Sequence, residues 1–268
     1  MVNKNDSAAD NESKENIQQL STLWNDDKWL KNLSYNEMHF ERFLQSTDFE
    51  VFDAFERIKA FYEILFQYPE WMTCETPADK KHIIEKDIRV ALPHTDKEGR
   101  PIYIVKIGNV DCNKMTIHDV VAVDDIWIES LLISNPNCKN GLCVIIDIAN
   151  YSWRLIKWMT PHNIKIGLKK LQSIPLKEYR FHVVNQSAMI SATIKLIWPL
   201  LPDYIKKMVM FHFNNRESLH SHIDPTVLPQ EYGGKNSSID YNKIYEDLFN
   251  QNEKIHKNFE FYKNLRKV

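Results

Sequence analysis

Several side chains of this 268-residue chain are of the types that enzymes and metal sites use. Asp147 follows a run of apolar residues with the composition of a buried strand, and α/β enzymes often place catalytic carboxylates at such strand ends. His220, His222 and Asp224 have the composition of metal ligands, but histidine pairs at this spacing also occur by chance in ordinary loops. We interpret this triplet as a surface loop.

The sequence lacks the motifs that would support nucleophilic or nucleotide chemistry. It contains no GxSxG elbow, no GxGxxG and no GxxxxGK[ST], and only 6 glycines in all. Cys143 falls inside a hydrophobic strand, where a thiol is usually inert, and the spacing of the four cysteines fits no zinc motif. We therefore expect neither an enzyme nor a bound metal or cofactor.

Composition and charge narrow the class of partner. The 34 basic residues nearly balance the 36 acidic ones, which argues against broad nucleic-acid binding. The N-terminus has no apolar run typical of a secretory signal, and no stretch approaches the roughly 18 apolar residues of a membrane span. These features predict a reduced, soluble, cytoplasmic protein with no evident obligate protein partner.

The first part of the chain predicts helices. Residues 1–16 are polar and aperiodic, so we expect them to be disordered. Asp48–Tyr68 carries apolar residues at the 3.6-residue period of an amphipathic helix, which Pro69 closes.

From about residue 86 the pattern alternates between strands and helices, which predicts an α/β domain with a largely parallel sheet. The expected strands are 88–92, 101–107, 142–148, 181–184 and 207–213, and the expected helices between them are 117–133, 161–172 and 188–198. The resulting division is a disordered N-terminus (1–16), a helical module (17–85), an α/β domain (86–235) and a helical tail (236–268).

Four segments, taken in order, resemble the CRAL-TRIO lipid-binding family. They are Arg42-Phe-Leu44 with the long helix after it, Gly99-Arg-Pro-Ile-Tyr103, Val144-Ile-Ile-Asp147, and His182-Val-Val-Asn185 followed at a distance by Leu228-Pro-Gln-Glu-Tyr-Gly-Gly234. Together they span about residues 35–235, and they are more similar to the tocopherol- and retinaldehyde-binding branch than to the phosphatidylinositol-transfer branch.

The resemblance implies an all-helical module followed by an α/β domain, whose mostly parallel sheet forms the floor of a hydrophobic pocket beneath a helical gate. It implies intracellular binding of one hydrophobic molecule, such as a tocopherol, retinoid or carotenoid, and its transfer through transient contact with membranes. Two alternatives stay open: a lipid-sensing or protein-interaction module that transfers nothing, and a phosphatidylinositol-type carrier. In this family an aspartate at the position of Asp147 is structural.

The expected gate is the apolar segment 188–201, which includes Trp198. A carrier must open, and a helix with apolar residues around most of its circumference can face the ligand on one side and the bilayer on the other. Composition alone equally fits a buried core helix.

Alignment to the family implies the residues of the pocket, for each of which ordinary core packing is the alternative. Leu142, Val144 and Ile146 alternate along one strand and so share a face of the sheet. Aromatic Tyr151 and Trp153 favour a ring-bearing isoprenoid over a two-chain phospholipid. The full set is Ile128, Leu131, Leu142, Val144, Ile146, Tyr151, Trp153, Ile166, Ile174, Phe181, Ile190, Ile194 and Ile197.

The chain also departs from the family pattern. Asn185-Gln-Ser187 replaces the usual Asn-Glu-Pro, although Ser187 can cap the gate helix. Of the basic residues that bind a phosphoinositide headgroup in the tocopherol branch, only Lys177 is matched, with Arg180, Lys206 and Lys207 as substitutes beside Trp198. A solvated basic face is the alternative, and we interpret Asp124-Asp125 as a solvated helix face too.

Overall fold

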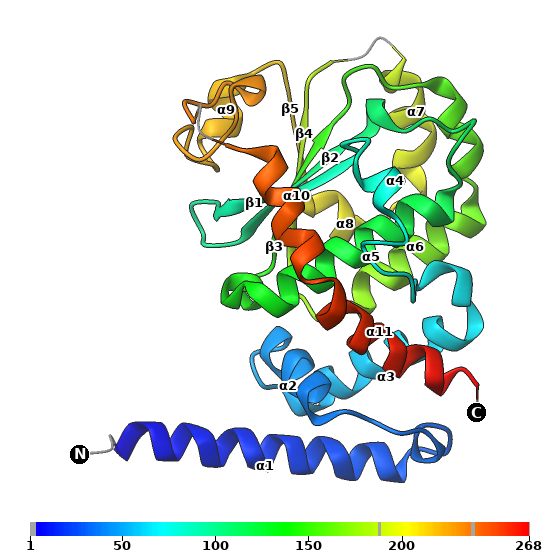
Figure 1. Cartoon of the computed structure of the whole chain (residues 1–268), viewed down its shortest axis with the longest axis vertical. Coiled ribbons are helices and arrows are strands. Elements are labelled where there is room, and N and C mark those ends of the chain that lie inside the picture. Colours follow the sequence, from blue (N-terminus) through cyan, green and yellow to red (C-terminus); the bar gives the residue numbers. More distant parts are fainter. Residues whose placement is uncertain (1–3, 187–188, 237–238, 268) are drawn as a thin grey trace.

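The computed structural model describes residues 4–186, 189–236 and 239–267. Three helices, α1 (Lys4–Asp26), α2 (Glu37–Ser46) and α3 (Val51–Gln67), form an N-terminal module below an α/β domain (Figure 1). The last two helices, α10 (Tyr241–Asn250) and α11 (Asn252–Leu265), run from the sheet back to that module.

Two features of the N-terminal module differ from expectation. Helix α1 begins at Lys4, inside the segment expected to be disordered; its alanine, glutamate, lysine and glutamine residues are good helix formers. Helix α3 begins at Val51, three residues later than predicted. Asp48 and Phe49 have φ values of 52° and 65°, which a right-handed helix cannot contain.

The sheet has five strands in the order β1-β2-β3-β4-β5. β1 pairs antiparallel with β2, and the remaining neighbours pair in parallel, which confirms the predicted, largely parallel sheet. The strands are β1 (Arg89–Thr95), β2 (Pro101–Lys106), β3 (Leu142–Asp147), β4 (Tyr179–Val184) and β5 (Val209–Phe213).

Helices α5 (Ile117–Ser134) and α6 (Pro161–Ser173) lie over one face of the sheet. Each starts at a threonine cap: Thr116 forms a capping box with Asp119, and the Thr160 hydroxyl accepts from the Asn163 amide. Both helices were predicted within two residues of their observed ends.

The remaining helices are short. They are α4 (Lys81–Ile84), α7 (Ile190–Ile197), α8 (Asp203–Met208) and α9 (Arg216–His220). Two of them differ from the expected pattern: the last residues of α8 fall where a strand was expected, and α9, which Asn215 caps, lies where no helix was expected. No helix among the described residues has the length and apolar character needed to cross a bilayer.

The C-terminal helix α11 fastens the two parts of the molecule together. The Tyr262 ring stacks on His39 of α2 with ring centroids 5.0 Å apart. Glu129 of α5 accepts hydrogen bonds from Arg42 of α2 at 2.9 Å and from Asn258 of α11 at 2.6 Å. The helical module, α5 and the tail therefore share one buried polar contact.

Candidate functional site

A cavity of about 290 Å³ lies between the sheet, α5 and α6. Its floor contains Tyr103, Val144 and Phe181, which are neighbours across three parallel strands and so form one row. Its wall is predominantly apolar, as expected for a site that takes a hydrophobic ligand. The lining residues predicted from the sequence are Ile128, Leu142, Val144, Ile146, Ile174 and Phe181.

Gly167 lies in the middle of α6 and lines this cavity. A methyl group built on its Cα would have only the Trp71 ring within 4 Å, at 3.9 Å. Glycine inside a helix costs about 0.5–1 kcal/mol relative to alanine, so this position gives up helix stability and leaves open space in the wall.

Two ion pairs, Arg89 with Asp124 and Lys170 with Asp125, interrupt the apolar wall. Asp124 of α5 accepts hydrogen bonds at Oδ1 from Arg89 Nε at 2.6 Å and from the Tyr103 hydroxyl at 2.7 Å. Arg89 also donates to the carbonyl of Ile88. Burial and the neighbouring carboxylate both raise the pKa of Tyr103, so its phenol stays protonated as a donor.

The second ion pair joins Lys170 of α6 to Asp125 of α5. The Lys170 ammonium lies 2.5 Å from Asp125 Oδ1 and donates to the Trp71 carbonyl. The other oxygen of Asp125 accepts from the Thr73 amide at 2.9 Å. The interpretation of Asp124-Asp125 as a solvated face was therefore wrong: both line the cavity, and the side chain of Asp125 is only 11% exposed.

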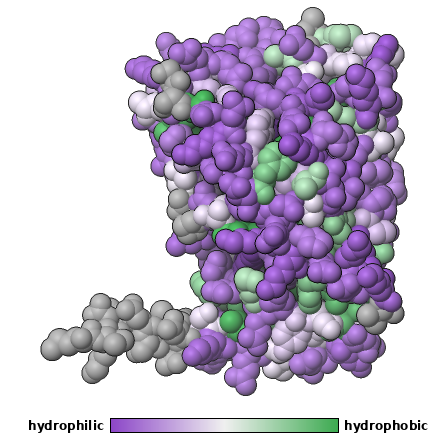
Figure 2. All heavy atoms as spheres, viewed as in Figure 1, coloured by the Kyte–Doolittle hydropathy of each residue, from purple (hydrophilic) through white to green (hydrophobic). Residues whose placement is uncertain are grey.

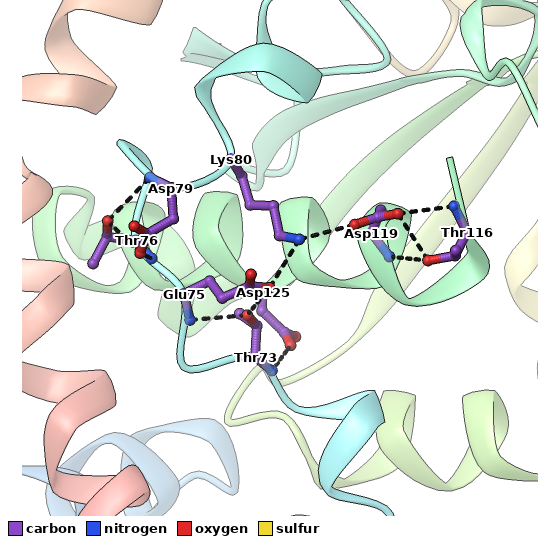
Figure 3. Close-up of polar contacts among 8 residues, drawn as sticks. All are labelled: Thr73, Glu75, Thr76, Asp79, Lys80, Thr116, Asp119 and Asp125. Carbon is purple, nitrogen blue, oxygen red and sulfur yellow. Dashed lines mark hydrogen bonds and ion pairs between the residues drawn. The ribbon is translucent and has the colours of Figure 1, made fainter. Parts of the chain in front are cut away.

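A strap formed by residues 73–80 holds this part of α5 in place (Figure 3). Thr73 binds Asp125 at one end of the strap, and Lys80 pairs with Asp119 at 2.8 Å at the other. Lys80 also pairs with Glu75 at 2.9 Å. The strap thus holds α5 from the side away from the cavity. Asp125 belongs to both sets of contacts, because it binds Thr73 of the strap and Lys170 of the cavity wall.

The expected gate helix α7 lies beside the cavity, and its residues do not belong to the lining. Thr193 donates from its hydroxyl to the Tyr151 hydroxyl at 3.2 Å, and Trp198 packs on Phe211 of β5 with centroids 5.3 Å apart. Ile190 is buried, while Ile194 and Ile197 are half-buried. Ser187, proposed as the cap, lies outside the described residues; in the described part α7 begins at Ile190.

Four other predicted pocket residues lie away from the cavity wall. Leu131 and Ile166 are buried in the core without lining the cavity, and Tyr151 is buried beneath α7. Trp153, in contrast, is 60% exposed, because it opens a short 3₁₀ helix, Trp153–Trp158, that follows β3 on the surface.

The predicted basic residues mostly have acidic partners. Lys177 pairs with Asp48 at 2.7 Å, Arg180 with Glu178 at 2.9 Å, and Lys206 with Asp203 at 3.3 Å. Lys207 is exposed. An anionic headgroup would therefore compete with three existing ion pairs for these cations.

Asp147 is the centre of a hydrogen-bond network at the carboxyl ends of β3 and β4. Its Oδ1 accepts from Asn185 Nδ2 at 2.5 Å and its Oδ2 from the Tyr232 hydroxyl at 3.0 Å. Arg216 donates to Asn185 at 2.6 Å and to the Glu231 carbonyl at 3.0 Å. Three motifs that are separate in the sequence, at Asp147, Asn185 and Tyr232, therefore meet here, and both oxygens of Asp147 are used in structural hydrogen bonds.

Backbone geometry explains why both positions after Tyr232 are glycine. Gly233 has a φ of 73°, which favours glycine. A Cβ at Gly234 would lie 1.8 Å from the Leu228 carbonyl oxygen, so no side chain fits.

The histidines predicted to form a surface loop lie partly inside. His222 packs its ring against His182 of β4 and His212 of β5, with centroids at 5.2 and 5.8 Å, on the face opposite to the cavity. His220 contacts the Tyr232 carbonyl at 3.1 Å. Within the ranges that the structure describes, no group of His, Cys, Asp and Glu is arranged to hold a metal ion.

Comparison with known proteins adds independent findings. Residues 85–234 match the family model of the CRAL/TRIO domain. The chain is similar to Clavesin-1 of Rattus norvegicus (34% identical over 202 residues, covering 72% of this chain and 55% of that protein) and to Clavesin-2 of Mus musculus (29% over 197 residues, 72% and 60%). It thus matches about 60% or less of the length of these curated relatives.

A solved structure has the same fold. The crystal structure of Sfh5 superposes on 96% of this chain and on all of its own chain, with a TM-score of 0.55 and 14% sequence identity. At that identity the similarity concerns the architecture of helical module and α/β domain.

Proposed function

Because the chain belongs to the CRAL/TRIO domain family, a family of lipid-binding proteins, we propose that it carries one hydrophobic small molecule between membranes. The observation that supports this most strongly is the apolar cavity under α5 and α6, floored by Val144, Ile146 and Phe181. The alternation that places Val144 and Ile146 on one face of the sheet, and the open space at Gly167, together give the cavity a predominantly apolar wall.

The size of the cavity favours a compact ligand. Its volume of about 290 Å³ lies just below the range of small-molecule sites, which is about 300–1,000 Å³. A two-chain phospholipid is far larger, so a smaller isoprenoid, such as a retinoid or a tocopherol, suits the site better than a phospholipid or a carotenoid.

Exchange requires a part of the protein that meets a membrane, and α7 with the turn after it is the best candidate. Leu196 and Leu200 are 55% and 45% exposed, while Ile190 and Thr193 on the same helix are buried. A short helix with one face on the core and exposed leucines on the other can insert those leucines at a bilayer surface. In contrast, the face seen in Figure 2 is mostly hydrophilic, with small separate apolar patches.

The test is transfer of a fluorescent isoprenoid from donor to acceptor vesicles at catalytic amounts of protein. We expect transfer that scales with protein concentration. Binding without transfer would instead support the non-transferring module, and transfer of phosphatidylinositol but no isoprenoid would support the phospholipid carrier.

A further inference from the structure

The two acidic side chains in the cavity wall differ in how fully their oxygens are used. Both oxygens of Asp125 are occupied, one by Lys170 at 2.5 Å and one by the Thr73 amide at 2.9 Å. Asp124 receives its two short hydrogen bonds at the same oxygen, Oδ1. Within the described residues its Oδ2 accepts only one long contact, from Arg89 at 3.4 Å.

Exposure distinguishes the same residues. The side chain of Asp124 is 29% exposed, against 11% for Asp125, 9% for Lys170 and 8% for Arg89. Of the four charged side chains in the wall, the acceptor Asp124 is thus the most accessible.

The charges of the wall cancel. Arg89 and Lys170 are each paired with one carboxylate, so an anionic headgroup would have to break an ion pair in a poorly hydrated site to gain a partner. A hydroxyl group can bind at a lower free-energy cost, because it donates one hydrogen bond to Asp124 Oδ2 and leaves both ion pairs intact. Hydrogen bonds to a carboxylate are the stronger kind.

We propose that Asp124 selects the ligand: the cavity takes an uncharged lipid with a free hydroxyl group, whose proton is donated to Asp124 Oδ2. This inference rests on the proposed function and adds the polar group that the cargo must carry. Tyr103 and Arg89 are positioning residues, since both donate to Oδ1 and so hold the carboxylate of Asp124 in the cavity wall.

The experiment compares three forms of one lipid on the full chain. α-Tocopherol and retinol are each titrated beside the deoxy analogue, which lacks the hydroxyl, and the methyl ether, which keeps an oxygen acceptor but has no proton to donate. In at least one series we expect the alcohol to bind about 10-fold or more tightly than both other forms, the effect of one hydrogen bond to a charged group.

Asp124→Asn keeps the shape of the side chain but removes its charge, and it should reduce that discrimination about 10-fold. Asp119→Asn is the matched control, because Asp119 lies on the same helix and pairs with Lys80 outside the cavity. Tyr103→Phe removes a donor that positions Asp124 but keeps its carboxylate, so it should reduce the preference for the alcohol by a smaller factor; it provides a second readout if Asp124→Asn does not fold, and an unchanged preference would count against the role of Asp124.

The outcomes separate the two claims. Equal binding of all three forms by the wild-type protein, or a preference that Asp124→Asn leaves unchanged, overturns the role of Asp124 while the carrier function stands. If no member of either series binds, the proposed function fails for isoprenoid cargo and this inference fails with it.

Discussion

The hydroxyl of Tyr232 donates a hydrogen bond to Asp147 Oδ2 across 3.0 Å, although the two residues are 85 positions apart in the chain. Tyr232 is fully buried, and its contact fixes the Tyr-Gly-Gly segment to the end of β3. The carboxylate raises the pKa of this phenol further beyond what burial alone does. This pair therefore connects the Leu228–Gly234 segment to β3, the strand that carries Val144 and Ile146 of the cavity floor.

Replacing Tyr232 with phenylalanine should destabilise the fold. The variant leaves Asp147 Oδ2 without its donor in a buried site, which costs about 1–3 kcal/mol in the free energy of unfolding measured in urea. Tyr241→Phe is the control, because its hydroxyl donates to the 44% exposed Glu231 and should change the free energy by less than about 0.5 kcal/mol. Equal effects of the two variants would contradict a structural role for Asp147.

The free energy of unfolding should decrease as the pH is lowered, because the protein has buried histidines. Burial, with a smaller contribution from Arg42, lowers the pKa of His39 from 6.5 to about 3, and burial among His212 and His222 lowers that of His182 to about 3. Between pH 6.5 and 3 the unfolded chain binds protons at these rings that the folded chain does not. Stability is therefore greatest above pH 6.5 and decreases toward pH 3 by at most about 1.4 kcal/mol per pH unit for each ring.

His39→Phe isolates one of these contributions, since a phenyl ring can keep the stack on Tyr262. The slope of unfolding free energy between pH 6 and 5 should shrink by roughly 1.4 kcal/mol per pH unit at most. The exposed His256, replaced with glutamine, serves as control and should leave the slope unchanged. A slope that His39→Phe does not alter would place the acid sensitivity elsewhere.

Gly167 should allow binding and stability to be separated. Gly167→Ala adds a methyl group in ordinary van der Waals contact, and it should raise the free energy of unfolding by about 0.5–1 kcal/mol with lipid uptake retained. Gly167→Phe should fill the space between α6 and Val144 and reduce lipid uptake strongly, while circular dichroism shows a folded protein. Undiminished uptake by the phenylalanine variant would mean that the ligand lies in a different place.

The exposed leucines of the gate should affect exchange more than binding. Leu196→Glu with Leu200→Glu puts charges where the protein is expected to meet the bilayer, so vesicle association and transfer should drop about 10-fold or more while the amount of bound lipid stays the same. Phe52→Glu is the matched control, because Phe52 is 66% exposed on α3. A similar loss from Phe52→Glu would argue that any exposed apolar residue contributes.

Sequence patterns predicted the sheet well because its strands are continuous apolar runs, as at Leu142–Asp147, and the long helices because their apolar residues repeat with helical period. They failed at α8, because a helix this short has too few residues to show a periodic pattern. They also failed at α1, because its residues favour a helix although few of them are hydrophobic. Charged residues were the harder case.

Asp124 and Asp125 are a solvated pair by every local criterion, and only the opposing Arg89 and Lys170, 35 and 45 residues away in the chain, turn them into part of the cavity wall. His222 is similar, since its neighbours His182 and His212 come from two strands. The aromatic Trp153 shows the reverse error: alignment placed it in the pocket, but the 3₁₀ helix carries it to the surface.

The most direct test of the proposed carrier function is native mass spectrometry of the full chain, purified without detergent from a eukaryotic host, followed by organic extraction. We expect one hydrophobic molecule per protein, with an isoprenoid alcohol in the extract, and we expect Gly167→Phe to lose it. A protein that has only its own mass, and that takes up nothing from vesicles loaded with tocopherol, retinol or phosphatidylinositol, would contradict the proposed carrier function.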